Sequence, residues 1–183
     1  MNKDKKIKLS KFLSKYLRHE PESLGLNLQE GGWVPVADLL EACARHGQSL
    51  THLELSEIVA DSDKQRFAFD ATGSLIRAQQ GHSVPVDLQL APSVPPAVLY
   101  HGTVAAVLPA IWRTGLQKMS RHHVHLSPDV ATARRVGARR GKPVVLAVEA
   151  ATLHSAGAVF YESGNGVWLV DQVPPAYLRE LTD

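Results

Sequence analysis

The sequence predicts an α+β fold arranged as two lobes. Apolar residues near the N-terminus repeat with the spacing of amphipathic helices, four prolines crowd the middle of the chain, and short β-rich runs follow. Proline resists both helix and central strand because it lacks a main-chain donor. We therefore expect an N-terminal lobe over residues 1–83, a linker over 84–97 and a C-terminal lobe over 98–183.

The N-terminal lobe should contain helices. Apolar side chains spaced three and four apart predict the first one: Leu9, Phe12, Leu13, Tyr16 and Leu17. Pro21 should end this helix. A second helix fits 36–46 and a third fits 53–60, where Thr51 and Glu54 have the spacing of a capping box.

A hairpin should complete this lobe. Residues 66–70 and 74–78 have strand character, and they flank 71–73, which ends in glycine and predicts a turn. Three helices followed by a hairpin indicate a winged helix.

The C-terminal lobe should be built mainly from strands. Five short runs have strand composition: 97–100, 123–126, 143–148, 158–161 and 166–170. Helical segments are expected at 104–112 and 129–136.

The composition, with 44% hydrophobic and 21% charged residues over 183 positions, is typical of a soluble protein. The chain has no apolar run long enough to span a membrane and no apolar signal core, so a cytoplasmic monomer without membrane contact is expected. The lone Cys43 excludes an intramolecular disulfide and fits core packing. The net charge of +2 does not establish a nucleic-acid partner, although lysines crowd the first eighteen positions.

Arg18 and His19 stand side by side where the first helix should end. Arginine offers a bidentate fork for phosphate, and histidine can donate a hydrogen bond or exchange a proton near neutral pH. Taken alone, the pair fits a solvated arginine and a helix-ending histidine better.

A second polar group surrounds the hairpin. Lys64 and Arg66 alternate with Gln65, so on an extended strand both cations would share a face and could address one phosphate. Further side chains near the second strand could contact RNA: Arg77, Gln80, His82 and Ser83. Without other evidence, a solvated wing is the simpler interpretation.

The C-terminal lobe holds two short polar motifs. His101, Gly102 and Thr103 end an apolar run and suit hydrogen bonding to a ribose or a carboxamide. Asn165 and Gly166 stand between two strand runs and also fit a plain hairpin turn.

Two further sequence patterns in the same lobe could bind ions. The histidines within 122–127 suggest metal binding, but zinc needs at least three ligands and no accompanying motif is present, so no metal is predicted. Five cations fall within 134–143, where glycines bracket Arg139 and Arg140. This cluster fits either a solvated face or a turn that holds phosphate.

Taken in this order, the segments resemble the tRNA 2′-phosphotransferase family, also described as RNA 2′-phosphate:NAD⁺ phosphotransferases. The resemblance spans nearly the whole chain and is carried by these stretches: 11–19, 32–34, 64–67, 76–83, 99–103, 123–127, 141–145 and 165–169. It implies a winged-helix N-terminal lobe and an ADP-ribosyltransferase-like C-terminal lobe, with NAD⁺ and the RNA phosphate meeting between them.

The resemblance also implies the site residues. The catalytic set would be Arg18, His19, Arg66 and Arg139, although family members often have histidine where this chain has Arg140. NAD⁺ contacts would fall to His101, Gly102, Thr103, Leu126, Ser127, Asn165 and Gly166.

The implied reaction has two steps. The RNA 2′-phosphate attacks the ribose carbon that bears nicotinamide, which gives an ADP-ribosylated RNA 2′-phosphate. The adjacent ribose hydroxyl then attacks phosphorus and releases RNA with ADP-ribose 1″,2″-cyclic phosphate, a reaction associated with tRNA splicing. Two alternatives stay open: an ADP-ribosyltransferase acting on nucleic-acid ends or protein, and a winged-helix nucleic-acid-binding regulator.

Overall fold

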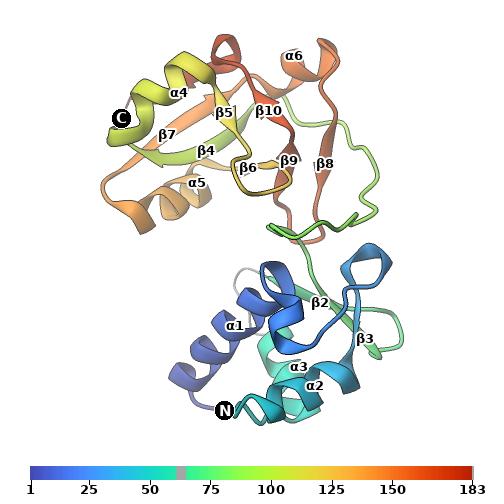
Figure 1. Cartoon of the computed structure of the whole chain (residues 1–183). Helices are drawn as coiled ribbons and strands as arrows, with labels where there is room; N and C mark the ends of the chain where they lie inside the picture. Colours follow the sequence, from blue (N-terminus) through green and yellow to red (C-terminus); the bar gives the residue numbers. More distant parts are fainter. Residues whose placement is uncertain (61–64, 183) are drawn as a thin grey trace. The chain divides into compact units, whose positions relative to one another are not determined.

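The computed structural model describes residues 1–60 and 65–182 and has the mixture of helices and strands that the sequence predicts (Figure 1). The chain divides into two compact units, Met1–Gln89 and Leu90–Asp183. Each unit has its own cluster of buried apolar side chains. The division falls within the range 84–97, which the sequence assigns to a linker.

Unit 1 packs its helices on a small antiparallel sheet. The helices are α1 (Lys3–Arg18), α2 (Val36–Arg45) and α3 (His52–Ala60). The strands are β1 (Val34–Pro35), β2 (Phe67–Phe69) and β3 (Leu75–Ala78), in the order β1-β3-β2. Short 3₁₀ turns cover Pro21–Leu24 and Glu30–Gly32. The predicted helices and hairpin are therefore present, with bounds that differ by a few residues.

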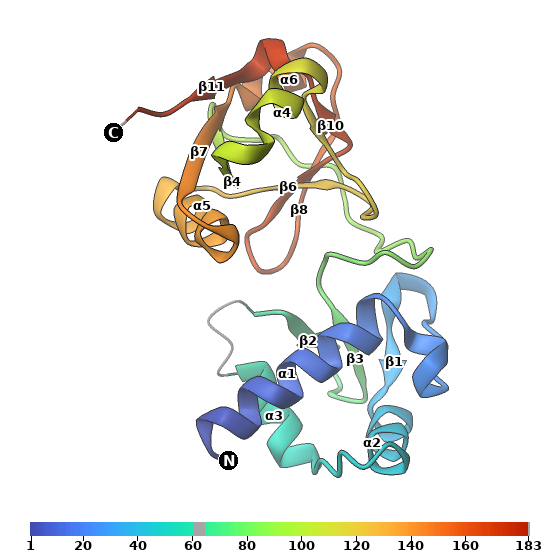
Figure 2. The ribbon, with the colours of Figure 1, turned by 60° about the vertical axis from the view of Figure 1, so that its left-hand side comes forward.

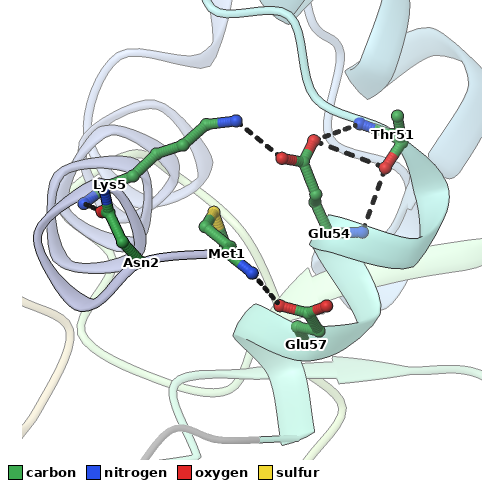
Figure 3. Close-up of polar contacts among 6 residues, drawn as sticks. All are labelled: Met1, Asn2, Lys5, Thr51, Glu54 and Glu57. Atoms are coloured by element: carbon green, nitrogen blue, oxygen red, sulfur yellow. Dashed lines mark hydrogen bonds and ion pairs between the residues drawn. The ribbon is translucent and has the colours of Figure 1, made fainter.

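Helix α1 buries the predicted apolar stripe. Leu9, Leu13 and Leu17 are at most 2% exposed. The helix begins six residues before Leu9, because the Asn2 side chain caps it by accepting a hydrogen bond from the Lys5 main-chain nitrogen at 2.8 Å (Figure 3). It ends at Arg18, and Pro21 opens the following 3₁₀ turn.

The predicted capping box at the start of α3 is confirmed. The main-chain nitrogen of Thr51 donates to the Glu54 carboxylate at 3.0 Å, and the Glu54 nitrogen donates back to the Thr51 hydroxyl at 3.2 Å (Figure 3). The Glu54 carboxylate also accepts a hydrogen bond from Lys5 of α1 at 2.6 Å. The first turns of α1 and α3 are thereby joined.

Cys43 lies in the core of unit 1, as the sequence predicts, and it is fully buried. Burial raises the pKa of its thiol to about 11, so the side chain is an uncharged apolar group at neutral pH.

The proline-rich segment forms neither helix nor strand in the described residues, and its two ends dock on different units. Residues near its start pack on unit 1, where the Asp87 carbonyl accepts a hydrogen bond from the Gly31 nitrogen at 3.1 Å. Residues near its end pack on unit 2, where the Ser93 nitrogen donates to the Phe160 carbonyl at 2.8 Å.

Unit 2 contains antiparallel sheets and three helices. One sheet has the order β11-β7-β4 and another has the order β6-β9-β8, while β5 pairs with β10. Figure 2 shows β11 beside β7 at the edge of this unit. The strands are β4 (Leu99–Val104), β5 (Leu116–Gln117), β6 (Val124–Leu126), β7 (Pro143–Val148), β8 (Phe160–Glu162), β9 (Trp168–Val170), β10 (Gln172–Val173) and β11 (Leu178–Glu180). The helices are α4 (Leu108–Thr114), α5 (Val130–Gly137) and α6 (Ala150–Ser155).

The bounds differ from the sequence prediction at β4 and α4. The strand predicted at 97–100 runs on to Val104, because it pairs with β7 along its whole length. The helix predicted at 104–112 is a 3₁₀ turn over Ala105–Val107 followed by α4, which has Pro109 in its first turn.

Helix α5 lies across β4 at very close range. A Cβ atom on Gly102 would sit 1.7 Å from the carbonyl oxygen of Ala133 and 2.8 Å from the main-chain nitrogen of Gly137. A Cβ atom on Gly137 would meet the Thr103 carbonyl at 2.8 Å. Glycine is therefore required at both positions by packing of main chain on main chain.

Among the described residues, no helix is both long and apolar enough to cross a membrane.

Candidate active site

Hydrogen bonds connect the end of α1, where Arg18 and His19 stand, with Arg66 in unit 1. Nη2 of Arg18 donates a hydrogen bond to the main-chain carbonyl of Arg66 at 3.4 Å. Nη1 of Arg66 donates to the hydroxyl of Ser10 at 3.2 Å. Ser10 is a buried residue of α1, two turns before Arg18. The end of α1 and the start of the hairpin are thus joined through two arginines.

The segment 81–83 returns to the end of α1. The Ser83 nitrogen donates to the Arg18 carbonyl at 3.0 Å, and the Ser83 hydroxyl lies 2.9 Å from Nδ1 of His19. A Cβ atom on Gly81 would lie 3.6 Å from Nη1 of Arg18. Ser83 therefore orients His19, and Gly81, whose φ of 88° favours glycine, passes within ordinary contact distance of the Arg18 guanidinium.

The strand geometry expected around Arg66 is not present. Strand β2 begins only at Phe67, and Gln65 has a φ of 36°, a left-handed backbone. Arg66 is placed instead by its own main chain, because its carbonyl accepts from the Gln79 nitrogen at 3.0 Å as well as from Arg18. Lys64, predicted to share a face with Arg66, lies outside the described residues.

Arg77 is engaged within unit 1. Its Nη1 donates to the main-chain carbonyls of Gly31 at 3.1 Å and Leu88 at 3.3 Å. Its guanidinium carbon lies 4.5 Å from the centre of the Trp33 ring, a cation–π contact. Arg77 therefore fastens the proline-rich segment to unit 1. These contacts explain why an arginine stands at this position, so the RNA contact predicted from the sequence is not needed to explain it.

The other predicted RNA-binding residues divide by exposure. Ser83 is exposed and Gln80 is half-buried, so both side chains have surface to offer. His82 is only 1% exposed, and its Nε2 would lie 3.7 Å from a Cβ atom on Gly32. We therefore assign His82 to packing, because a buried ring has almost no surface for RNA.

In unit 2, His101 is held in a defined orientation on β4. Its Nδ1 lies 3.1 Å from the main-chain carbonyl of His125, which can only accept a hydrogen bond, so Nδ1 carries the proton. Burial lowers the pKa of His101, and the positive charges of Arg140 and Arg121 lower it further, while the His125 carbonyl opposes the shift. The imidazole is therefore neutral at physiological pH and presents Nε2 as an acceptor.

The neighbours of His101 are largely structural. Gly102 is the close contact with α5, whereas the sequence motif suggested that a ligand approaches there. Thr103 and Leu126 are only 7% and 1% exposed, so both have little surface for a ligand. Ser127 exchanges two main-chain hydrogen bonds with Tyr100, at 2.7 and 2.9 Å.

Asn165 and Gly166 form the turn between β8 and β9, which pair antiparallel. Gly166 has a φ of 72°, a conformation that favours glycine. The buried Ser163 fixes this turn, because its hydroxyl donates to the Asn165 side-chain oxygen at 2.6 Å or to the Val167 carbonyl at 2.9 Å.

Three arginines gather in unit 2. Arg139 and Arg140 are exposed on a 3₁₀ turn, and Nη1 of Arg121 lies 3.4 Å from Nδ1 of His125. Partial burial lowers the pKa of Arg121, and the charges of Arg140 and Arg139 add to the effect. Within the described ranges, none of the three pairs with a carboxylate. The group is an uncompensated positive cluster beside His101 and suits an anion.

The histidines of 122–127 do not form a metal site in the described part of the chain, where no group of three potential ligands is close enough. The His123 ring instead lies edge-on to Tyr161, with ring centres 5.4 Å apart.

Comparison with known proteins gives the family. The RNA 2′-phosphotransferase, Tpt1 / KptA family model matches residues 4–172. The chain belongs to this family.

Relatives of similar length support the assignment. A protein of Nostoc punctiforme named "Probable RNA 2′-phosphotransferase" is 59% identical over 181 residues, covering 99% of this chain and all of the relative. Proteins of the same name from Streptomyces griseus and Flavobacterium johnsoniae are 56% and 48% identical, and in both cases at least 97% of each chain is covered.

For this member of the RNA 2′-phosphotransferase family, sequence reasoning missed Arg121 and Ser163. Arg121 directly precedes the histidine run and stands four residues before His125. This spacing indicates a contact between the two side chains only when 124–126 is known to be a strand. Ser163 stands two residues before Asn165, but nothing local to the sequence distinguishes it from an ordinary turn residue.

Proposed function

We propose that this chain removes an internal 2′-phosphate from RNA by transferring it to NAD⁺, releasing nicotinamide and ADP-ribose 1″,2″-cyclic phosphate. Family membership supports a transferase that acts on the 2′-phosphate of RNA. The observation that carries the proposal is the contact of the Arg18 side chain with the Arg66 main chain, directly beside His19 in the sequence. From these positions Arg18, His19 and Arg66 could offer two guanidinium groups and an imidazole to a dianionic phosphate.

We assign NAD⁺, as a co-substrate, to unit 2. Nε2 of His101 can accept a hydrogen bond from a ribose hydroxyl, because its Nδ1 proton is already committed to the His125 carbonyl. The Asn165 amide and the Ser127 hydroxyl bring side-chain hydrogen-bonding groups from the same unit, because the main-chain nitrogens of Ser127 and Gly166 already donate to Tyr100 and Ser163. Arg121, with Arg139 and Arg140, supplies positive charge for a phosphate group bound in the same unit.

The finer fold assignment is also a proposal. The three helices and the three-stranded sheet of unit 1 support a winged helix. The antiparallel sheets of unit 2, with α5 across β4, support an ADP-ribosyltransferase-like lobe.

In the first step, a 2′-phosphate oxygen forms a bond to the ribose carbon of NAD⁺, and the bond from that carbon to the nicotinamide nitrogen breaks with its electron pair. The nucleophile is already an anion, so Arg18 and Arg66 need only hold it in place. A carboxylate in this position would repel the phosphate, which explains the use of arginine.

In the second step, the adjacent ribose hydroxyl forms a bond to phosphorus, and the bond from phosphorus to the RNA 2′ oxygen breaks. The hydroxyl loses a proton and the RNA oxygen gains one. His19 directly follows Arg18 and carries an imidazole, the side chain best suited to proton exchange, and its Nδ1 contact with Ser83 orients the ring. Charge growing on the phosphoryl oxygens is stabilised by the arginines.

The decisive experiment combines the purified chain with an oligonucleotide that bears one internal 2′-phosphate, with and without NAD⁺, followed by mass spectrometry of all products. We expect loss of the phosphate only with NAD⁺, with the cyclic phosphate and nicotinamide formed in equal amounts, and no effect of EDTA. RNA or protein that ends with ADP-ribose attached would instead identify an ADP-ribosyltransferase. Absence of nicotinamide release would favour a binding protein.

A further inference from the structure

Helix α1 carries a row of lysines on its solvent side that leads to Arg18. Lys8, Lys11 and Lys15 are exposed, whereas Leu13 on the opposite side is fully buried. At about 100° per residue, Lys8, Lys11, Lys15 and Arg18 fall within an arc of about 80°. Intervals of three and four residues place each cation next to the following one.

Little negative charge opposes this row. Asp4 is the only acidic residue of α1, one turn before Lys8. Lys15 pairs with Glu20 at 3.0 Å, and both side chains are about half exposed. Among the residues that the structure describes, Lys8 and Lys11 have no carboxylate within ion-pairing distance.

Lys5, near the start of α1, serves a different purpose. Lys5 reaches across to Glu54 of α3 at 2.6 Å, and the amino group of Met1 pairs with Glu57 at 3.2 Å (Figure 3). These contacts fasten the helix to its neighbour. Among the described contacts, Lys8, Lys11 and Lys15 form no ion pair with α3. Attachment of α1 to α3 therefore does not explain why these three positions are lysine.

The length and end point of the row identify its partner. From Lys8 to Arg18 the helix rises about 15 Å, enough to follow a few consecutive phosphates of a nucleic acid strand. The row ends at Arg18 and His19, the residues assigned to the reacting 2′-phosphate. An RNA held there by its 2′-phosphate has further phosphates on either side, and these would meet the exposed lysines.

We propose that the row of Lys8, Lys11 and Lys15 binds the phosphodiester backbone of the RNA that flanks the 2′-phosphate. This proposal rests on the proposed function for the placement of the reacting nucleotide. Lysines that bind phosphates confer no preference for a base sequence, so this surface increases the affinity for longer RNA without selecting its bases. Glu20 weakens this surface at Lys15, because its carboxylate occupies the ammonium group.

The test compares a short and a long substrate. A dinucleotide with a 2′-phosphate on its first residue is long enough to contact Arg18 but not the lysine row. A twelve-nucleotide RNA with a central 2′-phosphate can contact both Arg18 and the row of Lys8, Lys11 and Lys15. We expect a lower KM for the long RNA in the wild type. Lys8→Ala combined with Lys11→Ala should raise the KM of the long RNA by about tenfold or more, with the dinucleotide KM and both kcat values unchanged.

Two further variants sharpen the test. Arg45→Gln removes one exposed cation from α2, where Arg45 pairs with Glu41, and should leave the length preference intact. Glu20→Gln releases Lys15 and should lower the KM of the long RNA. An equal rise in KM for the dinucleotide and the long RNA in the double variant, or an unchanged length preference, would overturn the proposal.

Binding measured by fluorescence anisotropy keeps the two proposals separable. A labelled twelve-nucleotide RNA without 2′-phosphate needs no turnover, and its affinity should fall in the double lysine variant, with the slope of log K against log salt reduced by about 0.7 per lost contact. If wild-type protein binds this RNA through the lysines but converts neither substrate, the proposed function fails and the binding surface stands. If both substrates react but the lysine substitutions change neither the KM values nor the anisotropy, the proposed function stands and the proposed binding surface fails.

Discussion

Arg18 and Arg66 are joined by a single main-chain oxygen. Nη2 of Arg18 donates to the Arg66 carbonyl at 3.4 Å, and the same carbonyl accepts from the Gln79 nitrogen at the mouth of the hairpin. The guanidinium of Arg18 is therefore positioned by the hairpin backbone. Arg77, from the same hairpin, donates to two carbonyls of its own unit.

Replacement of Arg18 and Arg77 by lysine should have opposite consequences. Arg18→Lys keeps the charge but loses the bidentate fork, so we expect kcat to fall by about 10²-fold or more with little change in thermal stability. Arg77→Lys loses two carbonyl contacts and the stacking on Trp33, so it should lower the melting temperature and leave kcat nearly intact. Steady-state kinetics and thermal denaturation of both variants check this, and a loss of kcat shared equally by the two would contradict it.

Arg66→Ala should separate the two chemical steps. Charge builds on the phosphoryl oxygens mainly in the second step, so that step needs the arginine most. We expect 2′-phospho-ADP-ribosylated RNA to accumulate, with phosphate transfer slowed by about 10²-fold or more. Mass spectrometry of a time course detects this species. If nicotinamide release is blocked as severely as formation of the cyclic product, Arg66 does not divide the steps in this way.

Arg121 and Arg139 compete for the role of the arginine in unit 2. Both arginines are exposed, but Arg121 lies beside His125, whose carbonyl orients His101, whereas Arg139 stands on a short turn. We expect Arg121→Ala to reduce kcat by about 10²-fold or more and Arg139→Ala by less than about tenfold. Single-turnover rates of the two variants decide between them, and the reverse order would restore the assignment made from the sequence.

The stability of unit 2 should depend on pH through His101. Burial lowers the pKa of His101, while the unfolded chain has the ordinary histidine value of about 6.5. Below that pH the unfolded state binds a proton that the folded state does not, so stability is full above about pH 6.5 and is lost as the pH falls. His123, whose pKa burial also lowers, acts in the same direction. Denaturation midpoints between pH 8 and 5 should fall less steeply in His101→Gln, and parallel curves would refute the link.

Gly102→Ala should unfold or severely destabilise unit 2, because the new methyl group would lie 1.7 Å from the Ala133 carbonyl oxygen. Overpacking of this kind typically costs about 1–3 kcal/mol and more where both partners are main chain. Gly166→Asn is the matched control, since Gly166 has open space around it and asparagine tolerates a positive φ. Urea denaturation of both variants tests the difference, and similar midpoints would show that α5 moves away from β4 at little cost.

Elements with a long repeating pattern could be predicted from the sequence. The leucine stripe of α1 and the capping box of α3 each leave a signal within a few neighbouring residues, and the structure has both. The two-residue strands β5 and β10 and the edge strand β11 were not expected, because so few residues show no alternation and their pairing is set by distant partners.

The candidate site was less predictable for a related reason. Arg18 and His19 could be singled out as neighbours in sequence, but the contact of Arg18 with the Arg66 carbonyl depends on how the hairpin returns to α1. Arg77 and His82 share the composition of an RNA-binding surface, yet tertiary contacts turn one toward carbonyls and bury the other. Residue type alone does not reveal which arginine faces solvent.

The docking of the proline-rich segment has a practical consequence for dissecting the protein. Its residues up to Gln89 belong to one compact unit and those from Leu90 belong to the other. A gene divided at this point would encode two fragments that each retain their own interior and the full set of main-chain contacts to the segment. Fragment 1–89 could then be titrated with RNA, and fragment 90–183 with NAD⁺, so that the affinity of each reactant is obtained without turnover.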